Sequence, residues 1–245
     1  LDTTTGILNT SAAGDGNAGT IDLNASGNIA TGSLSAIAEN GNGGAITVAT
    51  PTGDIQITDQ MNTSSQTQDA GNITLTAGGA IDASIGDELT SAALNADLDV
   101  YTLSALGGEN GGNITLEAGG DISAGFMGSL AENGTGGDIT LNSPNGEIKA
   151  SYTSVPSAGE APTEVGIILS VSEQGDGGDV TMSALGNIGT GSIGTGSLGN
   201  GVGGEISLNS QTGSIDTTVT LLPSLLAGLG LSSDLAEAVS AASGE

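Results

Sequence analysis

A short segment of alternating residues recurs seven times in this chain of 245 residues. Each copy starts with a glycine and continues with two larger apolar residues at alternate positions, as in residues 71–77 and 112–118. A unit this short cannot bury its own apolar face, so it must stack on its neighbours, which is typical of solenoid proteins. The anchor glycines are Gly19, Gly44, Gly71, Gly112, Gly137, Gly178 and Gly204, which places them 25, 27, 41, 25, 41 and 26 residues apart.

The alternation within each copy has the two-residue period of a β-strand. We therefore expect three inward columns of side chains, the last of them small where the chain turns. The first column is Ile21, Ile46, Ile73, Ile114, Ile139, Val180 and Ile206. The second is Leu23, Val48, Leu75, Leu116, Leu141, Met182 and Leu208. The third is Ala25, Thr50, Ala77, Ala118, Ser143, Ala184 and Ser210.

A second strand is expected after each copy, beyond a turn rich in Gly, Pro and Asn. It is centred on Ile29, Ile55, Ile81, Ile122, Ile148, Ile188 and Ile215. A less regular third side is expected at residues 7–8, 34–37, 100–103, 126–130, 167–171 and 193–198. The predicted fold is all-β: a right-handed parallel β-helix, or β-solenoid, with three short strands per coil of about 25 residues.

The division of the chain follows from where the repeat is interrupted. We expect a solenoid shaft over residues 1–220, because the two long spacings each fit one coil with an insertion. These insertions lie near 84–99 and 151–165, and we expect a helix at 87–96 and a Pro-containing loop at 151–164. The repeat pattern is lost in residues 221–245, which we expect to form a helical or irregular tail that is either a cap or another insertion.

Composition excludes several classes of function. The chain has 28 acidic residues and one basic residue, giving a net charge of −27, and it has no His, Cys or Trp. Nucleic-acid binding needs clustered cations, and His-based triads, thiol nucleophiles and Cys/His zinc sites lack their residues. A carbohydrate-active β-helix enzyme with paired carboxylates is the enzymatic alternative. Sugar binding usually relies on aromatic side chains, and the chain has three of them in all, far apart in the sequence. We therefore expect a protein without catalytic activity. No apolar stretch is long enough for a transmembrane helix.

One column of outward residues suggests a cation site. The residue after the anchor glycine is Thr20, Ala45, Asn72, Asn113, Asp138, Asp179 and Glu205. On neighbouring coils about 4.8 Å apart, two such charges repel by roughly 1 kcal/mol in water. Calcium readily accepts carboxylate oxygens. We therefore hypothesise a weak Ca²⁺ or Mg²⁺ ladder at Asp138, Asp179 and Glu205 with Asp176 beside it. The alternative is that these acids are simply solvated, and no cofactor is otherwise required.

The repeat sequence at residues 111–124 and 128–142 resembles that of the filamentous-haemagglutinin-like large exoproteins. These are passengers of two-partner secretion, and the likeness is to their cyanobacterial type. The resemblance implies a shaft exported through an outer-membrane secretion barrel and displayed outside the cell, where it serves adhesion, matrix or filament formation. It implies no catalytic residue. The secretion domain of that family is not evident here, so we expect an interior piece of a longer protein.

Partners are the least constrained part of the prediction. A solenoid without caps presents open strand edges, so we expect end-to-end or lateral self-association and no binding of nucleic acid. The alternatives to a structural shaft are the carbohydrate-active enzyme and a binding module that depends on divalent cations.

Overall fold

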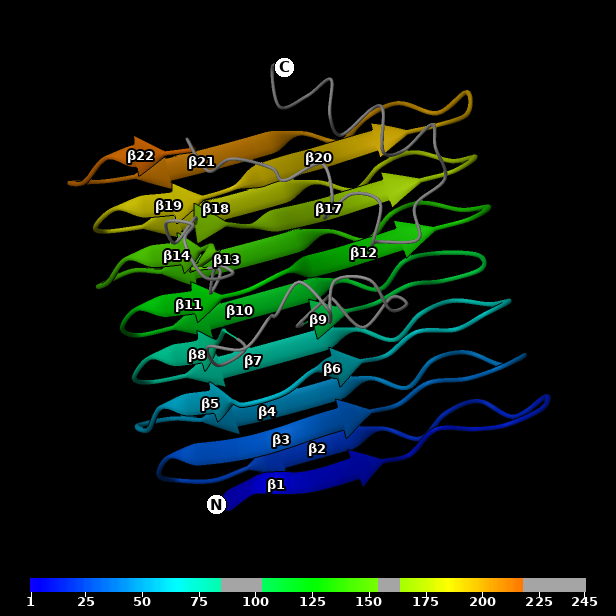
Figure 1. The fold of residues 1–245 in the computed structure, drawn as a ribbon, viewed down its shortest axis with the longest axis horizontal. Coiled ribbons are helices and arrows are strands. Elements are labelled where there is room, and N and C mark those ends of the chain that lie inside the picture. Colours follow the sequence, from blue (N-terminus) through cyan, green and yellow to red (C-terminus); the bar gives the residue numbers. More distant parts are fainter. Residues whose placement is uncertain (85–102, 154–163, 218–245) are drawn as a thin grey trace, which may run out of the picture.

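The computed structural model describes residues 1–84, 103–153 and 164–217. Its strands stack as the rungs of a ladder, from β1 near the N-terminus to β22 (Figure 1). The first side of every coil is a strand of one seven-stranded parallel sheet. These strands are β2 (Ile21–Asn24), β4 (Ile46–Thr50), β7 (Ile73–Ala77), β10 (Ile114–Ala118), β13 (Ile139–Ser143), β18 (Val180–Ala184) and β21 (Ile206–Ser210).

The second and third sides of the coils belong to one larger sheet of 13 strands. β1 (Asp2–Asn9) and β3 (Ile29–Ser35) run along both sides, and β3 pairs with β5 and then with β6. The second side continues with β5 (Ile55–Ile57), β8 (Ile81–Ala83), β11 (Ile122–Ala124), β14 (Ile148–Ala150), β19 (Ile188–Thr190) and β22 (Ile215–Asp216). The third side continues with β6 (Met61–Asn62), β9 (Leu103–Ser104), β12 (Met127–Ala131), β17 (Ile167–Ser172) and β20 (Ser192–Ser197).

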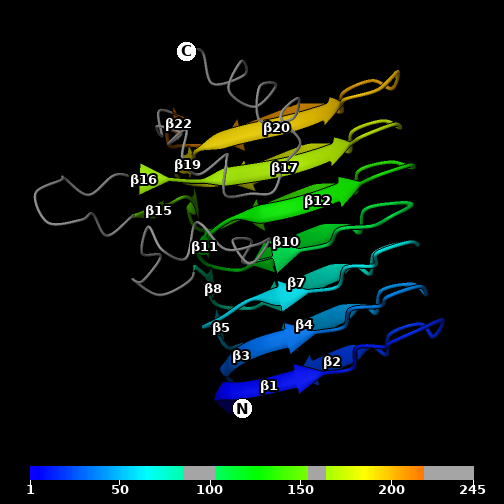
Figure 2. The same cartoon turned by 45° about the vertical axis from the view of Figure 1, so that its right-hand side comes forward.

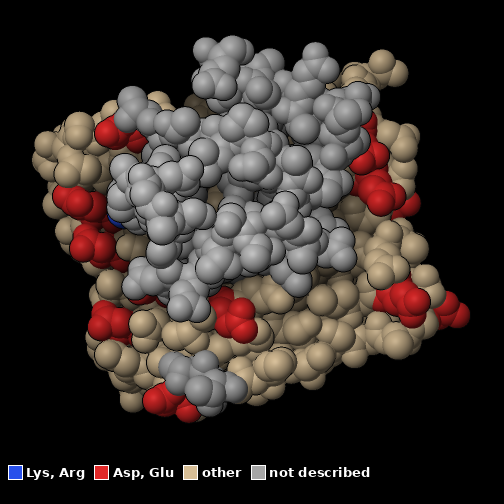
Figure 3. All heavy atoms as spheres, in the orientation of Figure 1, with Lys and Arg blue, Asp and Glu red and all other residues tan. Residues whose placement is uncertain are grey.

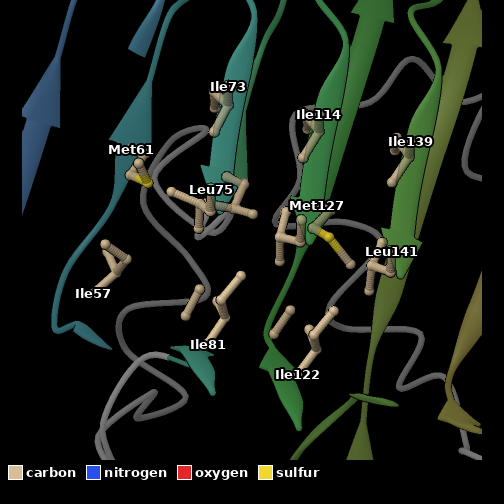
Figure 4. Packing of buried hydrophobic residues seen from close by; sticks show 14 of the residues in the cluster. Ile57, Met61, Ile73, Leu75, Ile81, Ile114, Ile122, Met127, Ile139 and Leu141 are labelled. Atoms are coloured by element: carbon tan, nitrogen blue, oxygen red, sulfur yellow. The ribbon is translucent and has the colours of Figure 1, made fainter. Parts of the chain in front are cut away.

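The register of the first side confirms the predicted inward columns. Ile114 of β10 pairs with Ile73 of β7 and with Ile139 of β13, and the next inward residues pair in the same way. Figure 4 shows these three isoleucines in a row above Leu75 and Leu141. All five side chains are fully buried. The chain is therefore a parallel β-helix with three short strands per coil, and its core is a set of continuous aliphatic columns.

Burial of the columns changes at the last coil. The second strand's isoleucines are buried from Ile29 to Ile188, and each such side chain stabilises the fold by about 1.5–3 kcal/mol. In the last coil, Ile206 is 45% exposed and Ile215 is 46% exposed. No described strand follows β21 or β22, so the columns lose part of their cover at this end of the described stack.

The anchor glycines are explained by stacking alone. A Cβ atom on Gly112 would overlap the carbonyl oxygen of Gly71, and one on Gly71 would overlap the carbonyl oxygen of Gly44. The main chains of neighbouring coils approach closely at this corner, and any larger residue would push two coils apart. The repeated glycine thus follows from the close approach of main chains and requires no ligand.

The two predicted insertions and the tail differ in how much of them the structure describes. The segment at 151–164, expected as a loop, is bordered by an antiparallel pair of β15 (Tyr152–Thr153) and β16 (Glu164–Val165). Pairing its two ends satisfies backbone groups where the chain leaves the coil. In Figure 2 this pair stands beside the stack, next to β17. The predicted helix at 87–96 and the predicted tail at 221–245 lie outside the described residues.

Within the described ranges, the structure contains no helix with the length and apolarity that crossing a bilayer requires.

Candidate functional site: the corners and outer faces of the coils

The file of residues after the anchor glycine is joined by hydrogen bonds from coil to coil. The backbone N–H of Asn113 donates to Oδ1 of Asn72 at 2.9 Å, and the N–H of Asp138 donates to Oδ1 of Asn113 at 2.9 Å. Oδ1 of Asp138 then accepts from the N–H of Asp179 at 2.9 Å, and Oδ1 of Asp179 accepts from the N–H of Glu205 at 2.7 Å. Each Asn or Asp side chain therefore serves the backbone of the coil that follows it.

The reason lies in the direction of the backbone groups. The N–H of Ile114 points toward the following coil, where it donates to the carbonyl oxygen of Asp138 at 2.9 Å. Successive N–H groups of an extended chain point in opposite directions, so the N–H of Asn113 points back toward the previous coil. At this position the main chain of the previous coil does not supply the acceptor, and the side chain of Asn72 does. A short side chain with an oxygen on its γ-carbon fits this gap.

Two further files at the corners use the same device. Together with the file after the anchor glycine we name them the Asx ladders. One lies before the second strand, where the bonds run from the N–H of Asp54 to Asn28, of Ala80 to Asp54, of Glu147 to Asp121 and of Ser214 to Asn187. The other lies before the anchor glycine, where they run from the N–H of Asn42 to Asn17, of Asn110 to Asp69, of Thr135 to Asn110 and of Val202 to Asp176.

The Asx ladders account for the residues of the cation hypothesis. The structure brings Asp138, Asp179 and Glu205 into one file, as predicted, and Asp176 lies in a neighbouring file. One carboxylate oxygen of each Asp accepts a backbone N–H. Within the described residues, no group of three or more acidic side chains is placed so that it could hold a metal ion. Hydrogen bonding explains why an Asp or Asn stands here, and calcium binding at these residues stays a prediction.

The sequence contained a signal for the ladders that charge-based reasoning missed. Asn and Asp occupy the same positions in successive coils, for example Asn113 above Asn72 and Asp138 above Asn113. The two residues differ in charge but share an acceptor oxygen at the same place. A position that accepts either residue therefore indicates a hydrogen bond to that oxygen more than it indicates an ion.

The outer face of the first side is polar and accessible. Thr47, Thr74, Thr115 and Thr140 pair with one another in successive strands and are half-buried, and Thr181 above them is exposed. Each points away from the aliphatic core because neighbouring residues of a strand face opposite ways. This face is a hydroxyl file in contact with water.

The outer face of the third side is different in character. Leu169 of β17 points away from the core residue Ile168, and its partners in the adjacent strands are Gly128 and Gly194. Glycines offer no side chain to cover it, yet Leu169 is 0% exposed. All six residues of β17 are buried, the pattern of a parallel strand covered on both faces. This face is therefore covered where β17 crosses it.

Two neighbours extend this buried outer face. Phe126, just before β12, is 1% exposed. Ser104 of β9, which pairs with Gly128 of β12, is also buried, and its hydroxyl has no hydrogen-bond partner within the described residues. Burying a hydroxyl group without a hydrogen-bond partner lowers the stability of the fold. The third side thus combines an apolar exterior with an unsatisfied polar atom.

The two internal gaps in the described residues lie at the same corner of the coil, between the second and third sides. One separates Ser84 from Leu103, and the other separates Thr153 from Glu164. Elsewhere the same link is short, as between Ile57 and Met61 in the third coil. We name this place the insertion corner. In solenoids, insertions gathered on one face often form the binding face, so this corner is the candidate functional surface.

Acidic side chains lie along the turns. Figure 3 shows Asp and Glu at the left and right margins of the view, where the strands of Figure 1 end. Glu39, Glu109, Glu132 and Glu173 are exposed in the turns that lead to the anchor glycines. Sugar-cleaving sites combine close carboxylates with an aromatic platform, but Phe126 is buried. The described residues therefore offer no exposed Phe or Trp for such a platform.

Comparison of the chain with protein-family models, with curated proteins and with solved structures finds no match.

Proposed function

We propose that this chain is a non-catalytic shaft segment of a secreted or cell-surface fibrous exoprotein that serves adhesion, extracellular matrix or filament formation. The observation that carries the proposal is the in-register stack of seven strands on the first side. Each coil adds the same rise of about 4.8 Å, so the architecture converts chain length directly into reach. At the corners, the anchor glycines allow the coils to approach closely and the Asx ladders bond one coil to the next, so both serve stacking.

The surface chemistry supports the same role. A net charge of −27 keeps such a rod dissolved and repels other copies at low salt. The insertion corner gives the rod one face on which loops can meet a partner without disturbing the stacked strands. Export through an outer-membrane secretion barrel and display on the bacterial outer surface are part of the proposal, and the resemblance of residues 111–142 to filamentous-haemagglutinin-like exoproteins is their support.

Electron microscopy of the native protein, combined with antibody labelling of intact cells, tests the proposal. We expect thin rods of even width and labelling of cells that have not been made permeable. Compact particles would contradict the shaft, and labelling that requires permeable cells would contradict display. A control antibody against a cytoplasmic protein reports whether the cells stayed intact.

A further inference from the structure

The corners of the coils contain a reactive dipeptide six times. In an Asn-Gly pair, the backbone nitrogen of the glycine can attack the side-chain carbonyl carbon of the asparagine. The new C–N bond closes a cyclic imide and ammonia leaves; water then opens the ring to give aspartate or isoaspartate. Glycine permits the attack because it carries no side chain to hinder it. The pairs are Asn40-Gly41, Asn42-Gly43, Asn110-Gly111, Asn133-Gly134, Asn145-Gly146 and Asn200-Gly201.

We propose that the fold directs this modification to Asn200-Gly201, in the last described coil. Asn200 is exposed, and its side chain makes no hydrogen bond to another described residue. The N–H of Gly201 donates to the hydroxyl of Ser197 at 3.1 Å, and the attacking nitrogen makes no other hydrogen bond to a described residue. Ring closure at this pair therefore requires the loss of a single contact.

Asn110-Gly111 shows the opposite case. Oδ1 of Asn110 accepts from the N–H of Thr135 at 2.9 Å, and Nδ2 donates to Asp69 at 2.8 Å. The attacking nitrogen, that of Gly111, donates to the carbonyl oxygen of Thr135 at 2.9 Å. The side chain and the nucleophile are both held by neighbouring coils, so the ring cannot close until several bonds break.

Asn133-Gly134 is held in the same manner. Nδ2 of Asn133 donates to the carbonyl oxygen of Gly108 at 2.8 Å, and Oδ1 accepts from Gln174 at 2.9 Å. The N–H of Gly134 donates to the carbonyl oxygen of Glu109 at 2.8 Å. Coils on both sides of this corner supply these bonds.

The remaining pairs have fewer bonds to break than Asn110 and Asn133, and Asn42, like Asn200, has no side-chain hydrogen bond to another described residue. The N–H of Gly43 donates to the carbonyl oxygen of Asp69 at 2.9 Å, and Nδ2 of Asn145 donates to the carbonyl oxygen of Gly119 at 3.0 Å. Among the described residues, the side chain of Asn40 makes one long contact of 3.4 Å, from its Nδ2 to Asp15. Asn40 is therefore the second site that the structure favours.

Space at the corner acts in the same direction. Isoaspartate adds a methylene to the main chain, and a corner with a coil on each side resists that lengthening. A Cβ on Gly134 would overlap the side chain of Asn110, and one on Gly175 in the following coil would overlap the carbonyl oxygen of Gly134. A Cβ on Gly201 would likewise overlap the carbonyl oxygen of Gly175. Within the described stack, lengthening is therefore resisted by coils on both sides of Gly134 and by a coil on one side of Gly201.

The product would alter the last coil that the structure describes. It adds a negative charge near Asp176, whose Oδ1 accepts from the N–H of Val202 at 2.8 Å. In the isoaspartate form it also lengthens the main chain between residue 200 and Gly201, next to Val202. Modification at Asn200 thus changes the end coil in charge and in shape while leaving the interior coils as they are.

Peptide mapping by mass spectrometry tests the proposal on the full chain kept warm at mildly alkaline pH, with a parallel sample in denaturant. In the denatured sample all six pairs should react at comparable rates. In the folded sample Asn200 should react first and Asn40 second, with Asn110 and Asn133 slower than Asn200 by about tenfold or more. Equal rates at Asn110 and Asn200 in the folded protein would overturn the proposal.

Two variants test the cause. Asp69→Ala removes the acceptor of the Asn110 side chain and should accelerate deamidation at Asn110 severalfold while leaving Asn200 unchanged. Gln174→Ala should do the same for Asn133, which keeps the test decisive if Asp69→Ala fails to fold. Asn200→Gln is the matched control and should abolish the earliest product. Unchanged rates at Asn110 and Asn133 in folded variants would show that these bonds do not govern the reaction.

Discussion

The first and third sides of the coil are made of parallel strands in the same kind of register, and they differ in what lies outside them. On the first side, a column such as Ile73 to Ile139 faces the core and a threonine file faces water. On the third side, the inner column is as regular, with Met127 between Leu103 and Ile168, but the outer face is apolar and covered at Leu169. Stacking fixes the inner residue on both sides, whereas the outer residue depends on what covers the sheet.

The largest expected effect separates these two outer faces. Leu169→Ala should lower the free energy of unfolding by about 3 kcal/mol, because it empties a buried site. Thr181→Ala, at an exposed outer position of the first side, should change it by less than about 0.5 kcal/mol. Urea denaturation followed by circular dichroism measures both. A neutral Leu169→Ala would mean that the outer face of the third side is as open as that of the first.

The second prediction concerns the close approach of coils at the anchor glycines. Gly112→Ala should cost about 2 kcal/mol, since its Cβ would overlap the carbonyl oxygen of Gly71. Gly196 of the third side has open space around its Cβ position, so Gly196→Ala should lie within about 0.5 kcal/mol of the parent. The same denaturation measurement compares them. Equal losses of unfolding free energy in the two variants would indicate that the close approach of coils is not the reason for a glycine at position 112.

The third prediction tests an Asx ladder on the first side. Asp138→Ala removes the acceptor for the N–H of Asp179 and should cost about 1 kcal/mol. Asp138→Asn keeps an oxygen at the same place and removes one of two neighbouring charges, so it should be at least as stable as the parent. If both substitutions cost the same, the charge of Asp138 and not its hydrogen bond would be what matters.

The smallest expected effect is that of calcium. Salt should raise Tm by screening the repulsion among acidic residues. CaCl2 should raise it no further than NaCl at equal ionic strength, because Oδ1 of Asp138, Asp179 and Asp176 already accepts backbone N–H groups. A larger rise with calcium, accompanied by heat in isothermal titration, would support the predicted cation ladder at Asp138, Asp179 and Glu205.

Much of the fold could be predicted from the sequence because stacking requires the same types of residue at the same positions of successive coils. An Ile at every coil and a glycine at every corner are direct consequences of burial and close approach, as Ile114 and Gly112 show. The outer face of the third side could not be predicted in the same way. Leu169 alone does not reveal whether the strand's second face is covered, since an apolar residue stands on either kind of surface.

The candidate site was predicted less completely. The file of Asp138 and Asp179 was predicted, but its hydrogen bonds were not. They depend on the direction in which each backbone N–H points, and composition does not reveal that direction. The antiparallel pair that closes the segment between Thr153 and Glu164 was also missed, because two residues on each side are too few for a strand pattern. The predicted helix at 87–96 and the tail at 221–245 stay predictions.

The Asx ladders give the rod a polarity. A coil that has already formed leaves acceptor oxygens of its Asn and Asp side chains facing the place of the next one, so addition toward the C-terminus finds acceptors for some of the incoming amides. If coils were added toward the N-terminus instead, the backbone N–H groups at these positions would wait for an acceptor until the preceding coil had formed. In the last described coil these positions hold Val202, Glu205 and Ser214, and the backbone N–H of each donates to an Asn or Asp of the coil before it. Winding that starts at the N-terminal end therefore meets at least one such acceptor at every step of the described stack.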